Sequence, residues 1–486
     1  MMDGDMMDPL LEGLEPRLLW KHFDELRKIP RCSKHEEKVI AYIVSVADRL
    51  GLGYTKDDMD NIVVRKPASP GHEKAPIVVL QGHVDMVCEK NKEVPFDFST
   101  DAIKLRMEGE YLYATGTTLG ADNGIGVCSA LAVLEDEDIV HGPIEALFTV
   151  DEETGLTGAF SLGKDLLRGR LMINLDTEEE RALYVGCAGG GESEIHMPVL
   201  WEDPRGKAFH INFSGMKGGH SGVDIHLGRA NAIKLLARIL WKAARDNDFS
   251  IANFSGGDKH NAIPREAEAV IVTRGDPAPI KDVITKAFEE VRFEYKSLEP
   301  GMDIKIGDIE PPSRTMTEED SRRMLHLLVS LPHGVQRMSP DIKDLVETST
   351  SMAKIRTEDD VYIQLASRSS SSSQLESLRD RIEAITVLAG GEADRGMAYP
   401  GWLPNLDSSV LSVLKGSAKE LWGKDPEIKA IHAGLETGII GEKYPGMDMA
   451  SIGPQIENPH SPDERVKVPS VKEFWDLLAL ALKKLA

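Results

Sequence analysis

Five short segments of this 486-residue chain carry acidic residues or histidines that could bind metal ions. Four of them follow an apolar run or a glycine-rich turn, and the fifth follows the last strand-like run. Their side chains offer nitrogen and oxygen atoms without cysteine sulfur, which suits a pair of divalent cations such as Zn²⁺, Mn²⁺ or Co²⁺. The segments are Gly82–Asp85, Thr118–Gly126, Asp151–Gly155, Asn174–Asp176 and Asn458–Glu464.

Two of these segments contain a histidine. His83 and Asp85 are two residues apart, so in an extended segment both side chains lie on one face. Asp85 is placed to fix the second ring nitrogen of His83, as a metal-binding histidine requires, or to orient another ligand. Taken alone, such a pair is more often a hydrogen bond within a turn. His460 lies between Pro459 and Pro462, which favours a rigid loop, although a surface histidine is an equally good interpretation of this segment alone.

The acidic segments are also ambiguous one by one. Asp122 stands in a glycine-rich turn before a predicted helix, where an aspartate is usually an N-cap. Asp151, Glu152 and Glu153 would normally form a solvated turn, and Asp176 alone says little. Beside other ligands, however, one carboxylate can bind a metal while its neighbour takes a proton from the attacking water. The combination therefore predicts a hydrolytic site with two cations.

Short apolar runs bounded by turn signals predict the buried strands that position these segments. They are Ala75–Leu80, Ile144–Val150 and Leu171–Leu175, and Val127–Leu134 is a helical candidate between the first two. Alternating strands and helices predict an α/β fold with a mostly parallel sheet. Ligands bind beyond the carboxyl ends of the strands in such sheets.

The middle of the chain has a different pattern, in which no apolar strand ends in a charged cluster. It contains strand-like and amphipathic helical segments, and the serine-rich run 369–373 is expected to be a flexible loop. The segments are Phe209–Phe213, Arg229–Arg245, Ala269–Thr273, Ile280–Tyr295 and Val361–Ala366. The first pattern returns at Glu427–Ile431, Asp448–Ile452 and Val468–Leu485. We therefore predict a catalytic domain formed by residues 1–187 and 401–486, with an α+β domain, residues 188–400, inserted into it.

Composition limits the possible partners and the compartment. Hydrophobic residues make up 41% and charged residues 28%, as in soluble globular proteins. The formal net charge of −23 argues against nucleic acid and anionic membranes as partners. The N-terminal segment has no basic region followed by an apolar run, so no signal peptide is expected. The four cysteines form no C-x-x-C pair, and their scatter favours a reducing compartment. Together these features predict a cytoplasmic protein.

Several longer motifs resemble those of the aminoacyl-histidine dipeptidases, also called cytosol non-specific dipeptidases. The similar segments are GHVDMV, GADNGIGV, DEETG, NLDTEE, GMKGGHSGVDIHLGRANA, HAGLETG and IGPQIENPHSPDERV. This family belongs to the di-zinc exopeptidases, a group that includes carnosinase, aminoacylase and carboxypeptidase G. The resemblance implies hydrolysis of dipeptides with broad specificity, including Xaa-His, by a homodimer whose inserted domain is a lid and dimerisation domain.

The resemblance also implies a ligand set for two divalent metal ions, with Zn²⁺ favoured over Co²⁺ or Mn²⁺. His83 and Asp176 would hold one ion, Glu153 and His460 the other, and Asp122 would bridge them.

The remaining roles that the resemblance implies are catalytic and substrate-binding. Asp85 would orient His83, and Glu152 would be the general base for a metal-bridged water. His220 would reach across the dimer to stabilise the oxyanion, although the glycines around it would equally mark a simple turn residue. Arg368, Asn261 and Gly434 match positions expected to hold the free carboxylate of the substrate. Without the resemblance, Arg368 would be interpreted as a surface arginine in a serine-rich loop.

Two other functions remain open at this stage. An aminoacylase or another amidase of the same group would cut N-acyl amino acids. A catalytically silent binding protein on this fold would usually have lost a ligand or the base, and neither is missing here.

Overall fold

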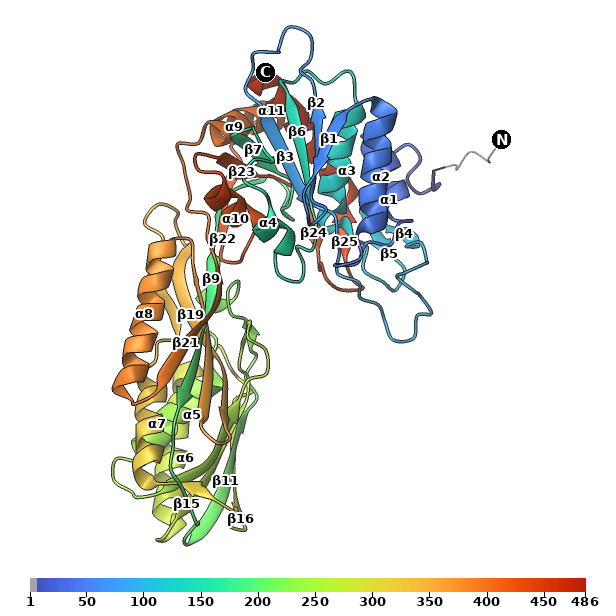
Figure 1. Ribbon diagram of the computed structural model, residues 1–486. Helices are drawn as coiled ribbons and strands as arrows, with labels where there is room; N and C mark the ends of the chain where they lie inside the picture. The colour runs from blue at the N-terminus through green and yellow to red at the C-terminus, as the bar shows by residue number, and fades with distance from the viewer. Residues whose placement is uncertain (1–6) are drawn as a thin grey trace. The chain divides into compact units, whose positions relative to one another are not determined.

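The computed structural model describes residues 7–486 and divides the chain into two compact units (Figure 1). The first unit comprises the described residues up to Gly186 together with Pro404–Ala430 and Leu435–Ala486. The second comprises Cys187–Leu403 and Ile431–Gly434. Residues 1–6, part of the segment in which no signal peptide is expected, lie outside the described residues.

The first unit is built on an eight-stranded sheet with the strand order β1-β2-β6-β3-β7-β23-β8-β22. Its strands are β1 (Gly53–Lys56), β2 (Ile62–Lys66), β3 (Val78–His83), β6 (Ile144–Thr149), β7 (Leu171–Asn174), β8 (Ala182–Cys187), β22 (Glu427–Ile431) and β23 (Asp448–Ser451). The four central strands β6, β3, β7 and β23 are parallel, whereas β1, β2 and β8 pair in antiparallel fashion. Every residue of β3 and β6 is buried, which explains why both strands are largely apolar. The predicted α/β fold is confirmed, with the parallel character confined to the centre of the sheet.

Helices cover this sheet, and one of them is buried along nearly its whole length. They are α1 (Arg17–Leu26), α2 (Glu37–Leu50), α3 (Ala121–Glu135), α4 (Thr157–Ser161), α9 (Ser409–Trp422), α10 (Glu436–Lys443) and α11 (Val468–Leu485). Helix α3 contacts β3 and also α1 and α2, beside which it lies in Figure 1, so its sides are apolar all round. None of the helices in residues 7–486 is long and apolar enough to cross a membrane.

A small four-stranded sheet, ordered β24-β25-β5-β4, also belongs to the first unit. Its strands are β4 (Leu105–Glu108), β5 (Tyr111–Ala114), β24 (Ile456–Glu457) and β25 (Arg465–Lys467). The antiparallel pair β24 and β25 encloses the loop that carries His460. Pairing of β25 with β5 anchors this loop to a segment far away in the sequence.

The second unit contains a nine-stranded sheet, all of whose described pairs are antiparallel. Its main path is β16-β11-β15-β13-β19-β20-β9-β21, and β18 pairs with β19. The strands are β9 (Gly189–Met197), β11 (Lys207–Ser214), β13 (Ser250–Gly256), β15 (Ala267–Thr273), β16 (Asp303–Ile309), β18 (Gly334–Met338), β19 (Val346–Thr357), β20 (Val361–Ser369) and β21 (Glu392–Tyr399). Helices α5 (Ala232–Ala243), α6 (Pro277–Tyr295), α7 (Glu318–Ser330) and α8 (Ser372–Leu388) gather beside this sheet in Figure 1 and share a large apolar core with it.

The serine-rich run differs from its prediction as a flexible loop. Ser369 ends β20 and Ser372 begins α8, so the run is a short strand-to-helix junction. Ser369 is fully buried, and its hydroxyl accepts a hydrogen bond from the Ser371 amide at 3.1 Å and forms another with the Thr348 hydroxyl at 2.9 Å. Local partners for the hydroxyl order the run, which composition alone does not indicate.

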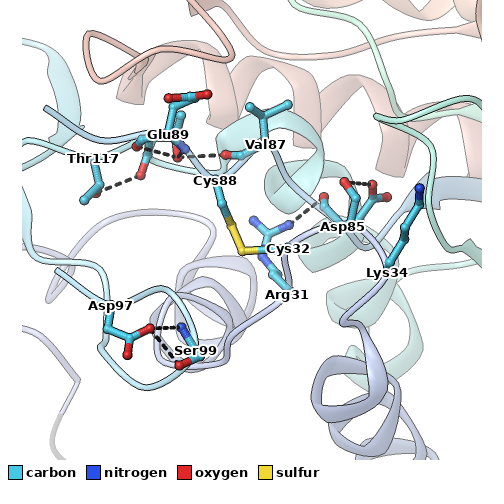
Figure 2. The surroundings of a disulfide bond; sticks show 12 residues. Arg31, Cys32, Lys34, Asp85, Val87, Cys88, Glu89, Asp97, Ser99 and Thr117 are labelled. Atoms are coloured by element: carbon cyan, nitrogen blue, oxygen red, sulfur yellow. Dashed lines mark hydrogen bonds between the residues drawn. A yellow bond between two sulfur atoms is a disulfide. The ribbon is translucent and has the colours of Figure 1, made fainter. Parts of the chain in front are cut away.

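Two of the four cysteines form a disulfide bond, between Cys32 and Cys88 (Figure 2). Their Cα atoms lie 5.6 Å apart although the residues are separated by 56 positions in the sequence. Cys32 and Met86 form a parallel backbone bridge, which brings the two segments side by side. This bond differs from what the scatter of the cysteines led us to expect, because disulfides are uncommon in a reducing compartment.

Candidate metal centre

The chain brings the predicted metal ligands to the carboxyl ends of the parallel strands in the first unit. His83 is the last residue of β3, and the acidic turn Asp151–Glu153 follows β6. Asp176 follows β7, and Asp122 lies in the first turn of α3. His460 comes from the loop between β24 and β25, where its backbone has a left-handed conformation with φ 60°.

The Asp122 carboxylate lies between the two histidines. Its Oδ1 is 3.2 Å from His83 Nε2 and its Oδ2 is 3.2 Å from His460 Nε2. Asp176 Oδ1 lies 3.6 Å from His83 Nε2, and Glu153 Oε2 lies 3.0 Å from His460 Nε2. The five side chains thus form two halves that share one carboxylate, the arrangement needed for two neighbouring cations.

The charges of this cluster favour cations. Burial opposes a charge on His83, but Asp176 and Asp122 raise the pKa of its ring well above the usual value. Hydrogen bonds with Asp122 and Glu153 raise the pKa of His460 to about 11. Burial raises the pKa values of Glu153 and Asp176, and the Asp122 carboxylate adds to both effects. Glu153 Oε1 is buried and has no hydrogen-bond partner among the described residues. Protons here stand in for positive charge that divalent cations would supply, so the donor set fits metal ions.

Asp85 contacts His83 at Nδ1, the ring nitrogen that does not face Asp122. This fully buried carboxylate lies 3.3 Å from His83 Nδ1 and accepts hydrogen bonds from the Ser33 hydroxyl at 2.8 Å and from the amides of Glu152 and Glu153 at 3.1 and 3.2 Å. Burial opposes its charge, but the hydrogen bonds, that of His83 foremost, lower the pKa of Asp85 below its usual value. Asp85 thus contacts both the His83 ring, whose Nε2 faces Asp122, and the acidic turn, as its predicted orienting role requires.

Glu152 is a carboxyl group with an unusual proton affinity. Burial raises its pKa well above the usual value, and the nearby carboxylates of Asp176, Glu153 and Glu436 act in the same direction. A carboxyl group whose pKa is raised in this way has the increased proton affinity that a general base requires.

Glu464 is a supporting residue that the sequence analysis missed. Its buried carboxylate accepts hydrogen bonds from four consecutive backbone amides, those of Leu119, Gly120, Ala121 and Asp122, at 2.7 to 3.3 Å. It thereby joins the His460 loop to the Asp122 turn. Its position four residues after His460, in the ENPHSPDERV motif, was the available signal.

Arg31 connects the Asp122 turn to the segment that follows β3. Its buried guanidinium donates hydrogen bonds to the carbonyl oxygens of Val84, Asp85 and Gly120 at 2.9, 3.0 and 2.5 Å. Figure 2 shows it beside the disulfide of the adjacent Cys32. The sequence gives no signal for this role, because the partners of Arg31 are backbone atoms 53 to 89 residues away.

Glu436 was also missed, although it lies in the HAGLETG motif. It is buried and accepts hydrogen bonds from Gln81 Nε2 and Thr149 Oγ1, both at 2.6 Å. Burial raises the pKa of Glu436 to about 7. It lies beneath the strand ends that carry the candidate ligands and adds negative potential near Glu152.

The other predicted site residues belong to the second unit. The short strands β12 (Gly219–His220) and β14 (Ala262–Ile263) pair His220 with Ala262, next to Asn261. His220 Nδ1 accepts hydrogen bonds from the amides of Gly222 and Val223 at 3.2 and 3.0 Å. Burial and the charge of Arg368 lower the pKa of His220. The ring is therefore neutral at pH 7, with its proton on Nε2 as a hydrogen-bond donor.

Arg368 and Gly434 meet around a tyrosine. Arg368 Nη1 donates a hydrogen bond to Tyr399 Oη at 3.0 Å. A Cβ atom on Gly434 would lie only 2.8 Å from the Tyr399 ring. The second unit therefore holds a cluster with a guanidinium and a neutral imidazole, while the first holds the acidic residues.

Comparison with known proteins places the chain in a family. Residues 79–484 match Peptidase family M20/M25/M40. The chain belongs to this family. It is 40% identical to the cytosol non-specific dipeptidase of Escherichia coli K12 over 98% of this chain and 99% of that protein. The resemblance to these dipeptidases is therefore confirmed.

Solved structures of the M20/M25/M40 fold agree with this placement. The crystal structure of aminoacylhistidine dipeptidase from Vibrio alginolyticus matches with a TM-score of 0.91 and 39% identity over 98% of both chains. The aminopeptidase PepT from Bacillus cereus has a TM-score of 0.55 at 18% identity, over 97% of this chain and 99% of that one, and shows the shared fold alone. The roles of individual residues stay predictions and are argued below.

Proposed function

We propose that this M20/M25/M40 family member is a two-metal dipeptidase of broad specificity that includes Xaa-His dipeptides. The observation that carries the proposal is the Asp122 carboxylate, which faces His83 with one oxygen and His460 with the other. The substrate class follows from the similarity to the Escherichia coli dipeptidase over nearly the full length of both chains. Its name also supports our expectation that this chain works in the cytosol.

The metal ions would be held in two halves. His83 and Asp176 would bind one ion, Glu153 and His460 the other, and Asp122 both. Zn²⁺ is the ion we favour for these nitrogen and oxygen donors, with Co²⁺ or Mn²⁺ as alternatives. When bound, the ions polarise the scissile carbonyl and lower the pKa of water.

The protein's own groups move the proton. Glu152 takes a proton from the attacking water and passes it to the leaving amine, a role that suits a carboxyl group with a raised pKa. Asp85 keeps the His83 ring in one orientation through the hydrogen bond at Nδ1.

The second unit would supply recognition and charge stabilisation. His220 donates a hydrogen bond from its Nε2–H group to the developing oxyanion, acting on the active site of the partner subunit in a homodimer. Arg368 binds the free carboxylate of the dipeptide through its planar guanidinium, and Asn261 and Gly434 line the same end of the substrate. A carboxylate anchor at a fixed distance limits hydrolysis to short peptides.

A metal titration of the apo-protein tests this proposal. The protein is stripped with a chelator, and activity on a panel of dipeptides and N-acetyl amino acids is followed as Zn²⁺, Co²⁺ or Mn²⁺ is added. We expect activity to return and to saturate at two ions per chain, with a higher kcat/KM for dipeptides. Faster turnover of N-acetyl amino acids would favour an aminoacylase instead, and absence of metal-dependent turnover of either substrate class would contradict both.

A further inference from the structure

The side chain of Arg368 is held in place by an unusual set of neighbours on three adjacent strands. Both β20 and β21 pair with β9, so that Gly190 of β9 stands opposite Arg368 on one side and Tyr399 on the other. Because Gly190 has no side chain, the two flanking side chains can meet above it. They do so through the hydrogen bond from Arg368 Nη1 to Tyr399 Oη at 3.0 Å.

The Tyr399 ring is wedged between two glycines. A Cβ atom on Gly190 would lie 2.6 Å from ring atoms of Tyr399, and a Cβ atom on Gly434 would lie 2.8 Å from Cε2. Real Cβ atoms do not approach other atoms so closely, so any larger residue at either position would displace the ring. The close backbone on both sides therefore fixes where the phenol oxygen lies.

Tyr399 is a suitable partner for an arginine that must bind an anion. A phenol accepts a hydrogen bond without neutralising the guanidinium, whereas an aspartate or glutamate would compensate its charge. Within residues 7–486, Tyr399 is the one side chain that hydrogen-bonds to Arg368, and the Nε atom of Arg368 is buried without a hydrogen-bond partner. The guanidinium is therefore oriented while its positive charge stays available.

We propose that Tyr399 is a positioning residue that aims Arg368 at the C-terminal carboxylate of the dipeptide. This inference rests on the proposed function, in which Arg368 binds that carboxylate. Tyr399 itself does not touch the substrate, but lowers the conformational freedom that Arg368 would otherwise lose on binding. Selectivity for peptides with a free C-terminus would then depend on the phenol hydroxyl.

The Tyr399→Phe variant tests this inference, because it removes the hydroxyl and keeps the wedged ring. For a dipeptide with a free carboxylate we expect kcat/KM to fall about tenfold, mainly through KM, as for the loss of a hydrogen bond to a charged group. For the same dipeptide as its C-terminal amide we expect no change, because the carboxylate contact is absent. The matched control is Tyr362→Phe in the same unit, for which both substrates should behave as with wild type.

A second variant reaches the same contact without altering the tyrosine. Gly190→Ala places a methyl group against the ring, 2.6 Å from its nearest atoms, and we expect it to raise KM for the free dipeptide while leaving the amide unaffected. Melting temperatures of all variants check that they fold.

The outcomes separate this inference from the proposed function. Suppose that the metal-loaded wild type hydrolyses dipeptides, but that Tyr399→Phe lowers kcat/KM equally for the free dipeptide and its amide, or for neither. The positioning role is then overturned and the dipeptidase proposal stands. If the wild type hydrolyses no dipeptide, the proposed function fails and this inference falls with it.

Discussion

The two candidate clusters of the molecule are built in opposite ways. In the metal centre of the first unit His83, Asp85 and Asp122 are buried while His460 is exposed, and the buried carboxylates of Asp85 and Glu464 each accept several hydrogen bonds, many of them from backbone amides. In the second unit, Arg368 and His220 are half-buried, and Arg368 has one side-chain hydrogen-bond partner among residues 7–486. The first cluster gathers negative charge and the second leaves positive charge uncompensated.

This difference indicates a division of labour. Groups that must hold cations at fixed distances need many bonds to rigid strand ends. Groups that must meet a substrate carboxylate and an oxyanion can be fewer, because the substrate itself supplies the missing charge. If so, substitutions in the cluster of the first unit should abolish metal binding or catalysis. Substitutions in the cluster of the second unit should lower kcat or raise KM while the metal ions stay bound.

Asp122→Ala should have the largest effect. Loss of the carboxylate that faces both histidines leaves neither half complete, so we expect both metal ions to be lost and kcat/KM to fall by at least about 10⁴-fold. Elemental analysis of the purified variant measures metal per chain. Asp138→Ala, an exposed aspartate of the same unit, is the matched control and should keep both ions. Two ions per chain in the Asp122 variant would contradict the bridging role.

Glu152→Gln should separate chemistry from metal binding within the first unit. The amide keeps the shape of the side chain but cannot accept the proton of water, so kcat should fall about 10³-fold while two ions stay bound. Turnover and metal content measured on the same preparation check this. Glu137→Gln, at an exposed position, is the control. A kcat close to that of wild type would show that another group is the base.

His220→Ala should reveal the contribution of the second unit. Removal of one oxyanion donor usually lowers kcat about 100-fold, and we expect this with an unchanged metal content. His226→Ala, exposed in the same unit, is the control.

Mixing the His220 and Glu152 variants asks whether the two units cooperate across subunits. In a mixed dimer one active site would combine intact Glu152 with intact His220 from the other chain, so activity should partly return. No recovery in verified mixed dimers would argue that His220 acts within its own chain.

The sequence predicted the first unit better than the supports of its site. Strands such as β6 were predicted because buried parallel strands are largely apolar. Asp122, Glu153 and His460, whose ligand roles stay predictions, were singled out because they belong to motifs at strand ends or in tight turns. Arg31 and Glu464 were missed because their partners are backbone atoms up to 345 residues away. Such contacts depend on the fold, and even the ENPHSPDERV motif that contains Glu464 does not reveal the backbone amides that this residue binds.

In the second unit, composition was misleading. The serine-rich run next to Arg368 was predicted to be flexible, yet it joins β20 to α8 with its first serines buried. Tyr399 was missed because its contact with Arg368 depends on strand register across β9, which one sequence does not show. Resemblance pointed to Arg368 but not to the residue that orients it.

Reduction of the disulfide between Cys32 and Cys88 should have the smallest effect on turnover, and it tests whether the metal centre of the first unit needs this bond. The bond closes a loop of 56 residues, for which chain entropy gives about 4 kcal/mol of stability. Arg31 and Ser33 keep their hydrogen bonds to the Asp85 segment when it is broken, so turnover should fall less than about threefold. Tris(2-carboxyethyl)phosphine should therefore lower the melting temperature of wild type but not that of Cys32→Ser, which already lacks the bond. A large loss of kcat on reduction would contradict this expectation. It would mean that the hydrogen bonds of Arg31 and Ser33 cannot hold the Asp85 segment in place without the disulfide.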